Sequence, residues 1–232
     1  MNSSKKSILN SNFTYLAAFV LPVIMMMALY YTRGIFPWGN ECYLRSDMYH
    51  QYAPFFSELW HKIRNGESLT YSWNIGMGTN FTSLFAYYLA SPSNWFVALF
   101  PQKYTIEIMN AFIILKIAGS SLSLTYYLTK HNNNKHVIAA IFGMFYGMSG
   151  FIAAYSWNIM WLDCVILIPL IMLGLERLVN ENRCIFYCIT LGLCIFTNYY
   201  IAIMVCLSVV IYYVVLMIAY NGCLLYTSPS PR

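Results

Sequence analysis

Two clusters of aromatic and acidic residues carry the side chains of this chain that are best suited to chemistry. The first, Arg45–Tyr52, contains Asp47 and His50, and the second, Ser156–Asp163, ends in a carboxylate. A carboxylate can act as general base on an acceptor hydroxyl, and aromatic faces stack on sugar rings. Should the two clusters converge on one cavity, their residue types predict group transfer to or from a sugar, with Asp47 and Asp163 as the catalytic candidates.

Each of these side chains also has a simpler explanation. Asp47 would cap a helix that runs through Tyr52, and Asp163 would cap the helix that follows it. Asp47 and His50 are three residues apart and share a helix face, so together they could hold a divalent cation. A metal site normally needs about three or more protein ligands. We therefore assign no metal site and expect His50 to contact substrate through a hydrogen bond.

Lys116 is the third chemical candidate, because it lies about ten residues inside an apolar run and hence near the middle of a membrane. An ammonium group at that depth should face the bundle interior or a wet cavity. Gly119, Ser120 and Ser123 give the same helix a small, polar face. That face could take the phosphate of a lipid-linked donor, with Lys116 as the charge. The alternatives are a structural ion pair or a side chain that extends toward the membrane surface.

Composition predicts a polytopic membrane protein. Hydrophobic residues make up 59% of the chain and charged residues 9%, against roughly 25% charged residues in soluble domains. Acidic and imidazole groups beside a bilayer are costly unless they bind or catalyse something, which singles out Arg45–Tyr52. The net charge of +5 is spread over short segments, so we expect no nucleic-acid partner. Most of the seven cysteines lie in apolar surroundings, which argues against a disulfide framework.

The apolar runs predict an all-α bundle of about six membrane spans. The predicted spans are Phe13–Tyr31, Ile106–Leu128, Val137–Tyr155, Val165–Leu178 and two short spans within Cys184–Tyr220, joined by a turn near Thr197–Tyr200. Basic residues before the first span and after the second place both of these segments in the cytosol. The segment Thr32–Thr79 is then an outside loop, and Asp47 and Asp163 face the same side of the membrane.

The segment Phe81–Phe100 is apolar enough to span, but Ser91–Asn94 interrupts it. Only one crossing can separate the outside loop from the cytosolic loop after Leu128. We therefore expect Phe81–Phe100 to form a re-entrant or interfacial pair of helices. Such backbone is tolerated at membrane depth where it is buried in protein or lines a cavity.

The last ten residues, 223–232, break abruptly from the composition before them and resemble the translation of a sequencing-library adaptor. We expect residues 1–222 to be the N-terminal part of a longer membrane domain. Residues 223–232 are expected to be an artefactual tail and are given no function.

Four parts of the chain carry long, specific strings rich in aromatic residues. They are Ser46–Tyr52 with Pro54–Phe56, Tyr71–Asn74 with Gly76 and Gly78–Asn80, Ala86–Pro92, and Tyr155–Asp163. Together these strings resemble the YfhO family of bacterial membrane proteins, whose members are much longer.

The resemblance implies a membrane glycosyltransferase of the type-C architecture in the bacterial cytoplasmic membrane. Such an enzyme would take a sugar from a polyprenyl-phosphate donor on the extracytosolic face, and the implied acceptor is an envelope polymer such as lipoteichoic or wall teichoic acid. In that architecture a catalytic acidic residue follows the first span, and Asp47 matches it. Asp163 matches an acidic position in the second outside loop. The resemblance implies no firm cofactor.

In the expected mechanism, Asp47 deprotonates or orients the acceptor hydroxyl while the sugar leaves its lipid phosphate. Lys116 or Arg45 would stabilise that phosphate, and aromatic side chains would shape the sugar pocket. The residues expected to contact substrate are Arg45, Tyr49, His50, Lys116, Trp157, Asn158 and Trp161.

Two other functions stay open at this point. A transporter or flippase of lipid-linked sugars would account for Lys116 and the interrupted segment Phe81–Phe100. A non-catalytic scaffold for envelope assembly would use the aspartates only as helix caps.

Overall fold

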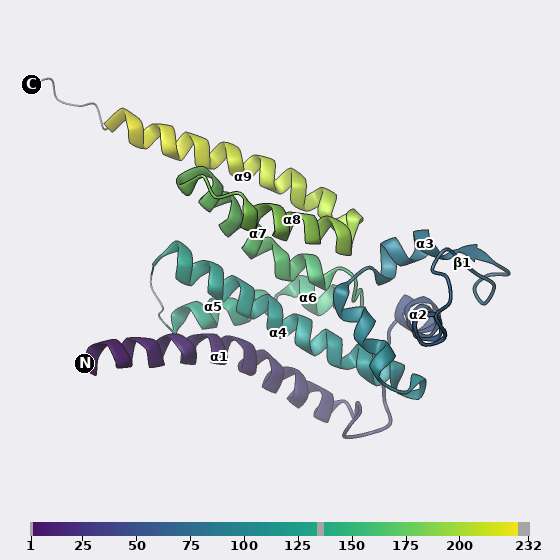
Figure 1. Ribbon diagram of the computed structural model, residues 1–232. Helices are drawn as coiled ribbons and strands as arrows, with labels where there is room; N and C mark the ends of the chain where they lie inside the picture. The colour runs from purple at the N-terminus through teal and green to yellow at the C-terminus, as the bar shows by residue number, and fades with distance from the viewer. Residues whose placement is uncertain (1, 134–136, 227–232) are drawn as a thin grey trace, which may run out of the picture.

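The protein is a bundle of long helices with short elements gathered at one end, as the computed structural model in Figure 1 shows. The structure describes residues 2–133 and 137–226. The long helices and their partners are α1 (Asn2–Thr32), α4 (Thr105–His131), α5 (Ile138–Gly147), α6 (Gly150–Tyr155), α7 (Leu162–Glu181), α8 (Ile185–Thr197) and α9 (Tyr199–Tyr226). The start of α1 and the end of α9 lie at the same end of the bundle (Figure 1). The predicted all-α membrane bundle is confirmed.

Four of the described helical segments are long and apolar enough to cross a membrane: Asn12–Thr32, Gln102–His131, Ile138–Tyr155 and Tyr199–Ala219. Of the two remaining predicted spans, α7 has 20 residues but carries charged residues at both ends, and α8 has only 13 residues. The count of six crossings therefore stays a prediction. The turn between the last two spans lies where it was expected, because Asn198 separates α8 from α9 and its side chain accepts a hydrogen bond from the Ile201 amide at 2.9 Å.

The span predicted as Val137–Tyr155 is two helices, α5 and α6, with a break at Met148 and Ser149. Ser149 has extended backbone with ψ near 163°. Just before the break, Gly147 packs so closely on α4 that a Cβ there would lie 2.8 Å from the Ile117 carbonyl oxygen. The break therefore sits at a close helix–helix contact within the bundle.

The short elements gather at one end of the bundle, called here the α2 end (Figure 1). They are η1 (Met48–Tyr52), α2 (Ala53–Asn65), β1 (Tyr71–Ser72), β2 (Thr79–Asn80), α3 (Phe81–Leu84), η2 (Phe85–Leu89), η3 (Pro92–Leu99) and η4 (Gln102–Tyr104). β1 and β2 pair antiparallel, with Tyr71 opposite Asn80.

The segment Phe81–Phe100 forms two helical pieces separated at Ala90 and Ser91, as its interruption predicted. The first piece reaches the bundle, because the Tyr87 carbonyl accepts a hydrogen bond of 3.0 Å from the side chain of Asn198. This interrupted segment therefore packs against the junction of α8 and α9.

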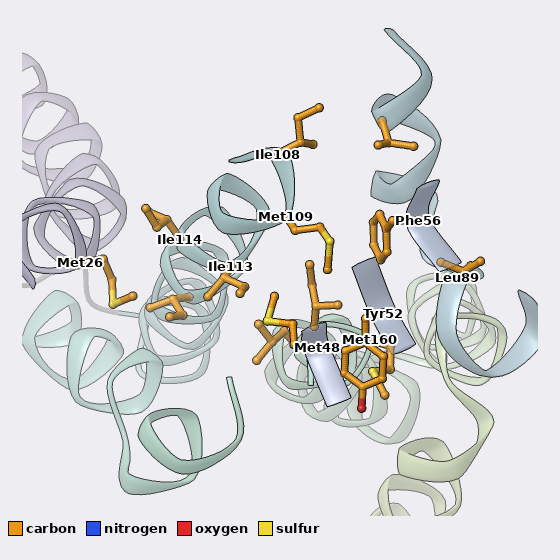
Figure 2. Packing of buried hydrophobic residues seen from close by; sticks show 14 of the residues in the cluster. Met26, Met48, Tyr52, Phe56, Leu89, Ile108, Met109, Ile113, Ile114 and Met160 are labelled. Atoms are coloured by element: carbon orange, nitrogen blue, oxygen red, sulfur yellow. The ribbon is translucent and has the colours of Figure 1, made fainter. Parts of the chain in front are cut away.

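The apolar residues of the Arg45–Tyr52 patch anchor it in the core. Met48, Tyr52 and Phe56 recur every four residues, a spacing that places side chains on one helix face, and all three are buried. Figure 2 shows Met48 and Tyr52 grouped with Met160, which comes from the second sequence cluster. This packing fixes the polar residues of the patch relative to the rest of the bundle.

A buried carboxylate joins α2 to the short hairpin. Glu58 accepts hydrogen bonds from the Ser72 hydroxyl at 2.6 Å and from the Asn74 amide at 3.0 Å. Lys62 lies 3.6 Å from the same carboxylate and donates to the carbonyl oxygens of Ser68 and Tyr71. Burial alone would raise the pKa of Glu58, but the hydrogen bonds and the charge of Lys62 outweigh it, so its pKa lies below the ordinary value.

Because the folded-state pKa of Glu58 is lowered, its ionised form stabilises the hairpin at neutral pH, and this contribution is lost as the pH falls through that folded-state pKa. We expect Glu58→Gln to lower the free energy of unfolding by about 2–3 kcal/mol at pH 7. The variant should also show a smaller loss of stability between pH 7 and pH 4 than the wild type. Thermal unfolding in detergent at the two pH values measures both effects.

The matched control is Glu67→Gln, because Glu67 is about half exposed and its contact with Lys62 is longer, at 3.7 Å. It should change the unfolding free energy by less than about 1 kcal/mol. Identical acid sensitivity in the wild type and Glu58→Gln would contradict this account of the hairpin.

Candidate functional site

Asp47 follows a turn with unusual backbone geometry. Ser46 has φ near +48°, in the left-handed region that residues other than glycine rarely adopt. The Met48 and Tyr49 amides then donate to the carbonyl oxygens of Arg45 and Ser46, at 2.9 and 3.2 Å. Asp47 occupies the N-cap position of η1, yet its side chain accepts no capping hydrogen bond. Its carboxylate is thus not engaged in the structural role that a cap would give it.

The two sequence clusters meet through Tyr52. Its hydroxyl donates to the Asn158 side-chain oxygen at 2.8 Å, and its ring stacks on Trp157 with 6.3 Å between centroids. Burial first, and then the charge of Asp47, raises the pKa of the Tyr52 hydroxyl. The same carboxylate also raises the pKa of Tyr88, after burial and Tyr87. The charge of Asp47 therefore acts on both hydroxyls, and one of these, that of Tyr52, is bonded to Asn158 of the second cluster.

Asp163 and Lys116 form a buried ion pair. The Lys116 ammonium lies 2.7 Å from the carboxylate of Asp163, and Lys116 is only 4% exposed. The ammonium also donates to the Ile159 carbonyl oxygen at 3.2 Å and to the Ser91 hydroxyl at 3.5 Å. Of the roles considered for Lys116, the structure contains the ion pair, and a contact with a donor phosphate stays a prediction.

Asp163 is not the cap of α7, because Trp161 holds that position. It lies instead in the first turn of α7, where a negative charge is favoured by the helix dipole. Through Lys116, Asp163 is linked to the backbone of the second cluster at Ile159 and to the interrupted segment at Ser91. The pair therefore ties three separate parts of the chain together.

Two buried donors of the second cluster have no hydrogen-bond partner among the described residues: the side-chain nitrogen of Asn158 and the indole nitrogen of Trp161. Asn158 is 2% exposed, and its other side-chain atom is held by Tyr52. Buried polar groups are nearly always hydrogen-bonded, to protein or to water. Two donors without a hydrogen-bond partner, beside stacked aromatic rings, match the hydroxyl groups of a sugar in hydrogen-bonding type.

The Arg45–Tyr52 patch contributes to two cavities. Arg45 lines the first, which has a volume of about 550 Å³. Tyr49 and His50 line the second, of about 530 Å³, together with Lys103 from η4. Both volumes fall within the roughly 300–1,000 Å³ usual for small-molecule sites. Asp47 itself lines neither cavity; in the sequence it lies two positions from Arg45, which lines the first, and two from Tyr49, which lines the second.

Apart from Asp47, Arg45 at the first cavity and the pair of Lys116 with Asp163, the predicted residues lie in three places. Tyr49 and His50 lie together at the second cavity, with ring centroids 5.3 Å apart. Trp157 and Asn158 lie with Tyr52, and Trp161 stacks on Tyr200 with 6.1 Å between centroids.

Sequence reasoning did not assign roles to Tyr52, Tyr88, Ser91 and Tyr200. Tyr52 had the clearest signal, since it lies inside the Arg45–Tyr52 patch at a spacing of four residues from Met48. Tyr200 reaches Trp161 only through the fold, and no local pattern points to that contact.

No group of three or more His, Cys, Asp or Glu side chains gathers as metal ligands within residues 2–133 and 137–226. Asp47 and His50 therefore gain no third ligand of these types in that part of the chain.

Comparison with known proteins places the chain in a family. The family described as bacterial membrane protein YfhO matches residues 17–228, which run past the boundary predicted at residue 222. No curated protein and no solved structure matched the chain. The match covers most of the sequence and both candidate clusters, and the bundle of apolar helices agrees with a multi-pass membrane protein. The chain belongs to the YfhO family of bacterial membrane proteins.

Proposed function

We propose that this protein is a membrane glycosyltransferase that moves a sugar from a polyprenyl-phosphate donor to a cell-envelope polymer. The observation that carries the proposal is the place of Asp47: its carboxylate is uncapped, its charge acts on the Tyr52 hydroxyl, and in the sequence it lies two positions from residues that line two cavities. A transferase needs room for a donor and an acceptor near its general base, and two cavities of this size support that requirement.

In this mechanism Asp47 removes the proton from the acceptor hydroxyl as the bond between the sugar and the lipid phosphate breaks. Trp157 and Trp161 provide aromatic surfaces for the sugar, and Asn158 has an open donor for one of its hydroxyl groups. Tyr49 and His50 contact the acceptor in the second cavity. Lys116 becomes a positioning residue, since it holds Asp163 and the backbone of the second cluster.

Three features support the type-C architecture: the family, the position of Asp47 after the first span, and the helical bundle. In that architecture the α2 end faces the extracytosolic side of the bacterial cytoplasmic membrane, and the acceptor is a polymer such as lipoteichoic or wall teichoic acid. The end of the bundle at which α1 starts and α9 ends would then face the cytosol.

A flippase for the lipid-linked sugar is the second candidate function. It is favoured by the two interruptions of helical backbone, at Ser91 and at Met148–Ser149, because broken helices line the substrate sites of many transporters.

Transfer by the purified full chain in detergent separates the two functions, because detergent leaves no membrane to cross. The assay mixes the chain with a panel of polyprenyl-phosphate hexoses and a soluble teichoic-acid acceptor. Sugar on the acceptor supports the transferase. Movement of the same lipids across proteoliposomes, without transfer in detergent, would support the flippase instead.

The link between Tyr52 and Asn158 gives a further prediction. Tyr52→Phe keeps the ring stacked on Trp157 but removes the hydroxyl that orients Asn158, so we expect about a tenfold loss of transfer rate with little change in donor binding. The matched control is Tyr88→Phe, whose hydroxyl makes only a long contact of 3.4 Å with Gln51. The control should lose less than about threefold, and equal losses in both variants would contradict a special role for Tyr52.

A further inference from the structure

The first cavity combines a charged rim with an apolar floor. It lies where the end of α1 and the loop after it face α4 and the break between α5 and α6. The rim carries Arg33, Glu41 and Arg45, and the floor includes Met26, Ile117 and Ile152. A cavity at membrane depth with charges only at its mouth is suited to a ligand that is itself amphipathic.

The loop after α1 is closed by its own backbone, which fixes part of the rim. The Ile35 amide donates to the Tyr30 carbonyl at 2.9 Å, and the Glu41 amide donates to the Gly34 carbonyl at 3.0 Å. Gly34 has φ near +62°, so the chain can turn sharply directly after Arg33. Arg33 and Glu41 are therefore held at the same cavity, although eight positions separate them.

Neither arginine of the rim has an ionic partner among the residues that the structure describes. The ion pairs of the described residues do not include Arg33 or Arg45, and Glu41 forms no salt bridge with either of them. Two guanidinium groups and one carboxylate give the rim a net charge of +1. A phosphodiester carries one negative charge, and the planar guanidinium group matches phosphate oxygens in a bidentate manner.

The broken third span supports a ligand in this cavity. Gly147, Met148 and Ile152 line it, so part of the interruption between α5 and α6 faces the cavity. Irregular backbone at membrane depth is tolerated only where it is buried in protein or lines a cavity. Residues on both sides of the break therefore line the cavity together with Ile117 of α4.

We propose that this cavity binds the phosphodiester head of a membrane lipid, with Arg33 and Arg45 on the phosphate and the lipid chain against Met26, Ile117 and Ile152. The identification of that lipid as the sugar donor rests on the proposed function. That identification agrees with the position of Arg45, two residues before Asp47. It also gives the phosphate two guanidinium partners, whereas the Lys116 ammonium is already paired with Asp163.

The test is binding of two probes by the purified full chain in nanodiscs of phosphatidylcholine. One probe is a fluorescent short-chain polyprenyl-phosphate glucose, and the other is a fluorescent phosphatidylglycerol. We expect Arg33→Gln with Arg45→Gln to weaken binding of at least one probe tenfold or more. Ala153→Phe, which places a large ring in the cavity, should weaken the same probe without removing a charge. Arg64→Gln is the matched control, because Arg64 is exposed and lines neither cavity.

Each outcome has a definite meaning. Loss of the prenyl probe alone identifies the cavity as a donor site, and loss of phosphatidylglycerol alone identifies it as a site for a bilayer phospholipid. Loss of both shows a general phosphodiester site. Unchanged binding of both probes in the double arginine variant and in Ala153→Phe would overturn the proposal, as would an equal loss in Arg64→Gln.

The binding readout is independent of catalysis, so the two proposals can fail separately. Asp47→Asn should bind the prenyl probe as the wild type does. Normal probe binding with no sugar transfer by the wild type would reject the glycosyltransferase and leave the lipid site standing. Sugar transfer that survives loss of both arginines would reject the cavity as the donor site and leave the glycosyltransferase standing.

Discussion

Asp47→Asn is expected to lower glycosylation of the envelope polymer by about 100-fold or more, because a positioned general base typically contributes about 10²–10⁴ to the rate. Asparagine keeps the size and hydrogen-bonding shape of the side chain but cannot accept the proton. Asp47 makes no capping hydrogen bond, so the substitution should leave the protein level and the unfolding temperature close to those of the wild type. The assay measures sugar on the polymer in cells that carry the variant as their only copy.

The control for Asp47 is an acidic residue at the same end of the bundle without a catalytic role. Glu67→Gln serves this purpose, because Glu67 is about half exposed and lines neither cavity. Its glycosylation should stay within about twofold of the wild type. Normal glycosylation by Asp47→Asn at normal protein level would remove Asp47 from the mechanism.

The second large effect is expected at the buried ion pair. Lys116→Met leaves the Asp163 carboxylate without its partner in a position that is only 13% exposed. Breaking such a pair usually costs about 3–5 kcal/mol, since one charge stays buried and uncompensated. We expect a loss of this size in the free energy of unfolding, measured by denaturant titration in mixed detergent micelles.

The double variant Lys116→Met with Asp163→Leu should recover most of that stability, because it removes both charges and fills the space with apolar atoms. The matched control is Arg183→Met, which breaks an exposed pair with Glu181 and should cost less than about 1 kcal/mol. Equal stability of Lys116→Met and the wild type would contradict the ion-pair account.

The double variant also separates structure from chemistry at Asp163. If it is stable and transfers sugar normally, Asp163 acts only as the partner of Lys116. If it is stable but transfers sugar at least about tenfold more slowly, Asp163 also takes part in the reaction.

The general architecture could be predicted from the sequence, because membrane spans are long apolar runs and their signal is local. The interruption of Phe81–Phe100 was predictable for the same reason, since Ser91 and Pro92 mark it directly. The break inside the third span was not predicted, although Gly147, Ser149 and Gly150 are a local turn signal. What the sequence does not show is the close contact of Gly147 with the Ile117 carbonyl, which exists only in the folded bundle.

The candidate site was predicted in its residue types but not in its pairings. Tyr52 and Asn158 are 106 positions apart, and Lys116 and Asp163 are 47 positions apart. Such contacts depend on how helices pack, which single-sequence patterns do not specify. Glu58 and Lys62 did have a local signal, a spacing of four on a helix, but nothing in the sequence shows that both are buried.

The proposed role of Asp47 is best tested by single-turnover transfer with the purified full chain in detergent, comparing the wild type with Asp47→Asn. Sugar on a soluble teichoic-acid acceptor and release of polyprenyl phosphate are followed together, with donor binding measured in the same samples. We expect transfer by the wild type, and full donor binding with at least about a 100-fold slower transfer by Asp47→Asn. Equal transfer rates in the two proteins, or no transfer by a wild type that binds donor, would contradict it.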